Sequence, residues 1–255
     1  MMLRNYSESA LAEKFKVEEK KVETYIDVNK PIFVRLDGKR FSKFTKGFDY
    51  PFDTVFRTVM QKTMLELCAE IQGAVMGYTQ SDEITILFQK VSEESQIMYG
   101  GRVEKIVSEL ASTATLAFNK YLIEEGEKSE RRDFYRTKYL QARFDCRVFN
   151  VDENPDEVFI WRCLDCEKNA IQMVSRSQFS HKELNNKDLG QMKEMLREKG
   201  IIINEMNQDY IYGICAVKEE MLLNKGTDRE CLRKKFVIKN AKLVLEGGMI
   251  NNENI

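Results

Sequence analysis

Two aspartates each follow a run of residues that favours β-structure. Asp37 comes directly after the apolar run at residues 32–36 and precedes Gly38, whereas Asp82 lies in a polar turn at residues 80–83 between two further β-rich runs. If these strands are neighbours, both carboxylates can bind a divalent cation. Mg²⁺ suits such a site because it typically takes one or two protein carboxylates together with the phosphates of its substrate. The pattern therefore indicates phosphoryl or nucleotidyl transfer.

Both segments also have a purely structural interpretation. Asp-Gly is a common turn dipeptide, and the sequence Gln-Ser-Asp-Glu between two strands can be only a polar hairpin loop. The residue types alone leave both interpretations open.

Four cations follow Asp37 within one short, aromatic-rich stretch. Such side chains, together with free backbone N–H groups, are suited to hold triphosphate oxygens. A solvated basic loop over a small aromatic cluster is equally consistent with the pattern. The cations are Lys39, Arg40, Lys43 and Lys46, and the aromatic residues are Phe41, Phe44 and Phe48.

The elements that would position these residues follow a split βαβ order. Hydrophobic periodicity predicts strands at residues 32–36, 74–78, 84–88 and 142–151, and amphipathic helices at 52–71 and 103–121. This order is typical of a four-stranded antiparallel sheet with two helices on one side. In that topology the end of the first strand lies beside the turn of the central hairpin. Asp37 and Asp82 should therefore be neighbours, which favours the metal interpretation.

The remaining segments complete an α+β chain. We expect an exposed helix at residues 8–21 and an exposed, charged connection at residues 124–138. Asn154 and Pro155 should be the N-cap and first residue of a helix that reaches Met173 or beyond. A shorter helix at 189–199 and late strands at 212–217 and 236–238 should follow. We predict a catalytic part at residues 1–150 and a second part at 151–255, with the alternative that both form one continuous unit.

Composition excludes several classes of protein. The 255 residues are 43% hydrophobic and 32% charged, with a net charge of −1, so a globular chain without a global basic field is expected. Any nucleic-acid contact must therefore use local patches. The N-terminal segment has no apolar run typical of a signal peptide or membrane span, so no membrane association and a cytoplasmic location are the default expectations. Cys163 and Cys166 are spaced like half of a zinc knuckle, but no second pair exists, which favours buried helical thiols.

Several motifs in order along the chain resemble the tRNA(His) guanylyltransferase superfamily of 3′-to-5′ RNA polymerases. Each motif is weak alone, but the set spans most of the chain. The motifs are Arg35-Leu36-Asp37-Gly38 with Phe41 and Phe44-Thr45, Tyr78-Thr79-Gln80-Ser81-Asp82-Glu83, Phe144-Asp145-x-Arg147-Val148, Trp161-Arg162 with Asp165, and Gly213-Ile214-Cys215.

The resemblance implies a polymerase-like palm that uses two Mg²⁺ ions, with nucleoside triphosphates such as ATP and GTP as substrates, tRNA as partner and a homotetrameric assembly. It implies metal ligation by Asp37, Asp82 and the carbonyl of Gly38, with Glu83 as a further catalytic residue. The implied nucleotide-binding residues are Asp37, Gly38, Lys39, Arg40, Phe41, Ser42, Lys43, Ser81 and Asp82. The implied residues facing tRNA or the activating nucleotide are Arg131, Arg132, Asp165, Asn169, His181 and Lys182.

One motif departs from the family pattern. Relatives that add guanosine to histidine tRNA carry His-Ile-Asn-Asn after Asp-Cys, whereas this chain has Glu167-Lys168-Asn169-Ala170. Ser42 also stands where many relatives have histidine. The resemblance is therefore to the guanylyltransferase-like branch, which implies templated repair of tRNAs with truncated 5′ ends after activation of the 5′-phosphate. Guanosine addition to histidine tRNA, a nucleotide cyclase and a non-catalytic RNA-binding module remain as alternatives.

Overall fold

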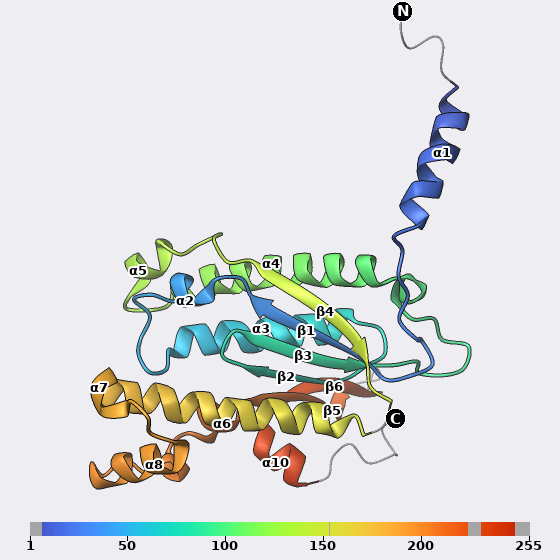
Figure 1. Cartoon of the computed structure of the whole chain (residues 1–255). Helices are drawn as coiled ribbons and strands as arrows, with labels where there is room; N and C mark the ends of the chain where they lie inside the picture. Colours follow the sequence, from blue (N-terminus) through green and yellow to red (C-terminus); the bar gives the residue numbers. More distant parts are fainter. Residues whose placement is uncertain (1–6, 153, 224–230, 248–255) are drawn as a thin grey trace, which may run out of the picture.

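A six-stranded antiparallel sheet forms the centre of the protein, in the strand order β4-β1-β3-β2-β5-β6 (Figure 1). The computed structural model describes residues 7–152, 154–223 and 231–247. The α+β class and the split βαβ order of the first four strands are as predicted. The strands are β1 (Ile32–Gly38), β2 (Ala74–Gln80), β3 (Glu83–Phe88), β4 (Phe144–Asn150), β5 (Ile214–Leu223) and β6 (Cys231–Asn240).

Helices cover both faces of the sheet, with α3 and α4 on one face and α6 and α10 on the other (Figure 1). The α-helices are α1 (Glu8–Lys20), α2 (Phe41–Phe44), α3 (Thr54–Glu70), α4 (Val103–Gly126), α5 (Arg132–Arg136), α6 (Asp156–Gln178), α7 (His181–Leu184), α8 (Leu189–Glu198), α9 (Gln208–Tyr212) and α10 (Ala241–Glu246). Two short 3₁₀ helices are η2 (Met98–Gly101) and η3 (Ile203–Glu205).

Alternating side chains of β1 pack into the hydrophobic cores on the two faces of the sheet. Ile32, Val34 and Leu36 pack with α3 and α4, whereas Phe33 packs with Phe159 of α6. Successive side chains of a strand point to opposite faces, so the nearly continuous apolar run in β1 reflects a strand that is covered on both sides. The residues Arg35 and Asp37 share the parity of Phe33 and therefore belong to the face that α6 covers.

The C-terminal strands belong to the same sheet as the N-terminal strands. β5 pairs with β2, in a register that places Ala216 opposite Gly77, and β6 pairs with β5. Both late strands were expected, but they are longer than the predicted segments 212–217 and 236–238. The division at residue 150 stays a prediction, because the sheet itself is shared by both parts of the chain.

Residues 124–138 differ from the exposed connection that their charge predicts. Helix α4 continues to Gly126 and α5 follows, with Tyr135 only 1% exposed. The Nζ of Lys138 donates hydrogen bonds to the carbonyl oxygens of Phe44 (2.7 Å) and Lys46 (2.9 Å). The segment is therefore packed against the loop that follows β1, and its charged residues surround the buried ring of Tyr135.

Smaller differences concern the helix ends. The N-cap of α6 is Pro155 rather than Asn154, whose side chain instead accepts a hydrogen bond from the backbone N–H of Asp156 at 3.2 Å.

The predicted exposed helix at the N-terminus is confirmed, since α1 has no buried residue and projects away from the sheet in Figure 1. The thiols of Cys163 and Cys166 are buried on α6, as expected. Within the described ranges, no helix has the length and apolar character needed to cross a membrane.

Candidate active site

The two predicted carboxylate segments meet at one end of the sheet. Asp37 lies opposite Glu83 in the β1–β3 ladder, and the backbone N–H of Gly38 donates a hydrogen bond to the carbonyl of Asp82 at 3.1 Å. Ser81 has a positive φ of 47°, which tightens the turn between β2 and β3, and its hydroxyl donates to Oδ1 of Asp82 at 3.0 Å. The prediction that Asp37 and Asp82 are neighbours is thus confirmed.

Both carboxylates are harder to ionise than ordinary aspartates. Burial, followed by the charges of Glu83 and Asp145, raises the pKa of Asp37. Burial also raises the pKa of Asp82 to about 6; the charge of Asp37 acts in the same direction, and the hydrogen bond from Ser81 opposes it. The site therefore concentrates negative charge that a bound cation would relieve.

The donor atoms at this position are all oxygens. No cluster of three or more His, Cys, Asp and Glu side chains suited to a metal ion occurs in the described part of the chain. A cation held here would thus have two protein carboxylates, with its other ligands supplied by backbone carbonyls, water or substrate.

Glu83 already has an ionic partner. Its carboxylate forms an ion pair with Nη1 of Arg162 on α6 and accepts a hydrogen bond from the side-chain amide of Gln80 at 3.1 Å. The Arg162 side chain is 5% exposed, and its Nη2 lies 3.3 Å from the carboxylate of Asp165. This buried arginine fixes α6 to the hairpin that carries Asp82.

Gly38 and Phe41 form a close-packed turn after β1. A Cβ atom on Gly38 would lie 2.4 Å from the ring of Phe41, so only glycine fits there without displacing the ring. The Phe41 ring is buried with Phe118 and Phe144, and any contact of Phe41 with a ligand would have to come from its backbone. The next charged and polar residues are exposed, namely Lys39, Arg40, Ser42 and Lys43.

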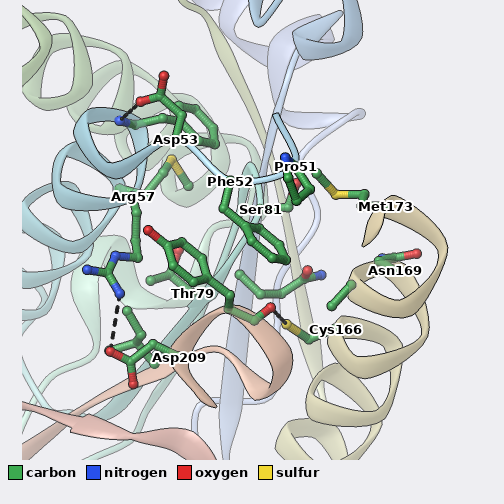
Figure 2. A pocket seen from close by; sticks show the side chains of 16 residues that line it. Pro51, Phe52, Asp53, Arg57, Thr79, Ser81, Cys166, Asn169, Met173 and Asp209 are labelled. Atoms are coloured by element: carbon green, nitrogen blue, oxygen red, sulfur yellow. Dashed lines mark hydrogen bonds and ion pairs between the residues drawn. The ribbon is translucent and has the colours of Figure 1, made fainter. Parts of the chain in front are cut away.

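A pocket of about 100 Å³ lies beside the Asp82 turn, between the start of α3, the end of β2, α6 and α9 (Figure 2). The rings of Phe52 and Tyr210 stack in it with centroids 4.4 Å apart, and the guanidinium of Arg57 lies 4.6 Å from the Tyr210 ring. Ser81 and Asn169 add polar groups to the lining. Sequence reasoning missed Phe52, Arg57 and Tyr210, because only the tertiary fold brings α9 to the start of α3.

The residues predicted to face tRNA or the activating nucleotide do not form one cluster. Asn169 lines the pocket and donates to Asp165 at 3.2 Å. Arg131 forms an ion pair with Asp49, so its guanidinium is already engaged. The others, Arg132, His181 and Lys182, are exposed, with the last two at the start of α7 and outside the pocket lining.

Comparison with known proteins gives a consistent result. A family model described as tRNAHis guanylyltransferase matches residues 12–152. A similar protein is a tRNA(His) guanylyltransferase from Debaryomyces hansenii, 26% identical over 83% of this chain and 82% of its own length. An uncharacterized protein of Acanthamoeba polyphaga mimivirus is 26% identical over 97% of this chain and 90% of its own length.

Solved structures extend the similarity over nearly the whole fold. A bacterial tRNA(His) guanylyltransferase-like protein in complex with ATP has a TM-score of 0.81 at 28% identity, covering 96% of this chain and 98% of the other. A bacterial protein of the same description in complex with GTP has a TM-score of 0.77 at 26% identity, covering 94% and 97%. The chain therefore belongs to the tRNA(His) guanylyltransferase family and is a nucleotidyltransferase.

Proposed function

We propose that this enzyme adds nucleotides in the 3′-to-5′ direction to the 5′ ends of tRNA, at the carboxylates of Asp37 and Asp82. The observation that carries the proposal is the meeting of these two partly buried carboxylates beside an aromatic pocket. ATP and GTP are proposed as substrates, which the nucleotide complexes of the two bacterial relatives support.

Mg²⁺ fits the donor set because both side chains offer hard oxygen atoms. The negative charges of neighbouring carboxylates, which help to raise both pKa values, would be relieved by a bound cation. Asp37, Asp82 and the carbonyl of Gly38 would hold the metal, which would neutralise phosphate charge and favour ionisation of an attacking hydroxyl.

The remaining residues of the site bind and orient the nucleotide. The exposed cations Lys39, Arg40 and Lys43 directly follow Asp37 and are suited to the triphosphate oxygens. The Phe52–Tyr210 pocket offers apolar surface to the nucleobase, and Ser81 lies between this pocket and Asp82. Glu83 orients the hairpin through Arg162 rather than serving as an open metal ligand.

Two tRNA substrates fit this chemistry. Templated repair of 5′-truncated tRNA is favoured by Glu167, which stands where guanosine-adding relatives have histidine and which forms an ion pair with Lys193 at 2.8 Å. Addition of guanosine to histidine tRNA is favoured by the description of the family model and by the relative from Debaryomyces hansenii. The proposed homotetramer is a separate prediction that light scattering can test.

Labelled nucleotide incorporation distinguishes the two substrates. The purified enzyme, Mg²⁺ and ATP are incubated with a tRNA that lacks its first 5′ nucleotide or with intact histidine tRNA. Template-matched extension of the truncated tRNA alone supports repair, and guanosine transfer to the intact tRNA supports the second substrate. Absence of incorporation into both RNAs overturns the proposal, and a small cyclic nucleotide formed without RNA would indicate a cyclase instead.

A further inference from the structure

The loop that follows β1 has little stability of its own. It spans residues 39–49 and contains α2, a helix of four residues. A helix of about one turn is marginal without tertiary support. Arg40, Lys43 and Lys46 follow one another at intervals of three residues, where like charges repel on a helix surface. The fixed position of this loop therefore depends on contacts from elsewhere in the chain.

Two cations beyond α4 supply such contacts through the backbone of the loop. Nζ of Lys138 donates hydrogen bonds to the carbonyl oxygens of Phe44 (2.7 Å) and Lys46 (2.9 Å). Nη2 of Arg131 donates to the carbonyl oxygen of Gly47 at 2.6 Å. None of the three carbonyls accepts a hydrogen bond from a backbone N–H in the described ranges. The two side chains therefore supply the hydrogen bonds that secondary structure would otherwise provide.

The ring of Phe134 contacts both cations and the loop. Its centroid lies 5.4 Å from Nζ of Lys138 and 4.6 Å from the guanidinium carbon of Arg131. Gly47 has a φ of 92°, and a Cβ atom there would lie 2.8 Å from the same ring. The loop backbone therefore packs directly on the ring that also attracts both cations.

Lys138 and Arg131 are committed to these contacts. Besides its two carbonyl acceptors, Nζ of Lys138 lies 5.9 Å and 5.7 Å from the ring centroids of Phe44 and Phe48. The other terminal nitrogen of Arg131 pairs with the carboxylate of Asp49. Any effect of these two cations on a nucleotide must therefore act through the loop.

The same loop carries the cations that are proposed to hold the triphosphate. Lys39, Arg40 and Lys43 are exposed, and they precede the carbonyls that Lys138 and Arg131 hold. A mobile loop loses conformational entropy when it orders around a ligand, whereas a loop that is already held in position loses less. Holding this loop should therefore strengthen triphosphate binding without any direct contact with the phosphates.

We propose that Lys138 and Arg131 are positioning residues for triphosphate binding, because they fix the loop at residues 44–47 and thereby the exposed cations at residues 39–43. This assignment rests on the proposed function, since it explains how the same site recognises a triphosphate. It gives Arg131 a role different from the direct contact with tRNA or the activating nucleotide that the resemblance implied.

The test compares two ligands with the same base, AMP and a non-hydrolysable ATP analogue, by calorimetric titration at fixed Mg²⁺. Lys138→Met should weaken the analogue about tenfold and AMP less than about twofold, because only the longer phosphate chain reaches the loop cations. Lys138→Arg, which can still donate to the carbonyls, should keep most of the affinity. Lys128→Met removes an exposed lysine that pairs with Glu125, and as the matched control it should change neither affinity.

Amide hydrogen exchange separates positioning from a simple effect of charge. In Lys138→Met, a peptide that covers residues 41–48 should exchange faster, on the order of tenfold, because the loop opens more often. In Lys128→Met the same peptide should exchange at the rate of the unmodified protein. A weaker analogue without faster exchange would show that charge alone acts, which would overturn the proposal.

Arg131→Gln is a second variant, which decides the question if Lys138→Met has no melting transition. It should weaken the analogue about threefold and leave AMP unchanged. Equal weakening of both ligands, or an unchanged ratio of the two affinities, would overturn the proposal.

Incorporation assays separate this role from the proposed function. In Lys138→Met the KM for the nucleotide should rise about tenfold while kcat changes less than about twofold. Incorporation with an unchanged KM would refute the positioning role alone. Selective loss of analogue binding in an enzyme that incorporates no nucleotide into RNA would refute only the proposed function.

Discussion

The carboxylates at the end of β1 and in the β2–β3 turn reduce the stability of the fold that carries them. Asp37 and Asp82 are neighbours, and burial disfavours their charged forms. For Asp82 the folded-state pKa of about 6 exceeds the ordinary value of 3.8, so the folded protein binds this proton more tightly than the unfolded chain. The proton bound to Asp82 therefore favours the folded state. This contribution is complete below pH 3.8 and is lost as the pH rises through about 6, so that the charged carboxylate lowers the stability at higher pH.

Asp82→Asn should therefore stabilise the metal-free protein at pH 8 while abolishing nucleotide transfer. The expected gain in the free energy of unfolding is up to about 3 kcal/mol at pH 8, and it should become small near pH 4. Urea unfolding in the presence of EDTA at both pH values measures the difference. An unmodified protein that is at least as stable as the variant at pH 8 would contradict this account of the charge.

At the scale of elements, one buried arginine joins α6 to the hairpin. Arg162 pairs with Glu83 and Asp165, and the hydroxyl of Tyr78 on β2 donates to the carbonyl of Arg162 at 3.1 Å. The position of the Asp82 turn therefore depends on a helix that begins 74 residues later in the chain, at Asp156.

Removing this buried ion pair should be costly. Arg162→Met leaves the Glu83 charge without its partner, so we expect a loss of about 3–5 kcal/mol in the free energy of unfolding. Arg197→Met, which removes an exposed ion pair with Glu194 on α8, should cost less than about 1 kcal/mol. Urea unfolding of both variants gives the comparison, and equal losses would show that the Arg162 pair has no special role.

The packed segment after α4 should support the pocket. The Tyr135 hydroxyl donates to Oδ2 of Asp53 at 2.8 Å, and Asp53 both caps α3 and lines the pocket. Tyr135→Phe should lower the free energy of unfolding by about 1–3 kcal/mol and weaken nucleotide binding. Tyr99→Phe, at an exposed residue, is the control. Calorimetric titration with an ATP analogue would refute this role if both variants bind equally well.

Much of the fold was predictable because its elements have strong local signals. The β-rich runs at residues 74–78 and 84–88 around the polar turn at 80–83 sufficed to predict the hairpin. The split βαβ order then predicted that Asp37 and Asp82 meet, as they do. Tyr135 escaped prediction because charged neighbours conceal a single buried ring. The Phe52–Tyr210 stack has no local sequence signal, because Phe52 lies just before α3 and Tyr210 lies on α9, far apart in the sequence.

At the scale of the whole molecule, the shared sheet predicts cooperative unfolding. β2 is central, with β3 on one side and β5 on the other, so neither part of the chain has a complete sheet alone. Trp161, the single tryptophan, reports on α6, and far-UV circular dichroism reports on all elements. The two probes should give coincident urea transitions. Two separate midpoints would instead support independent domains that divide near residue 150.

We propose that Asp37 and Asp82 together hold the metal that nucleotide transfer to an RNA 5′ end requires. The most direct measurement follows α-labelled nucleotide into a 5′-truncated tRNA with Mg²⁺ and ATP, using Asp37→Asn, Asp82→Asn and the exposed control Asp133→Asn. Both site variants should lose activity on the order of 10³-fold, because several kcal/mol of transition-state stabilisation disappear, and the control should keep it. Transfer by Asp82→Asn at the rate of the unmodified enzyme would contradict this role of the carboxylates.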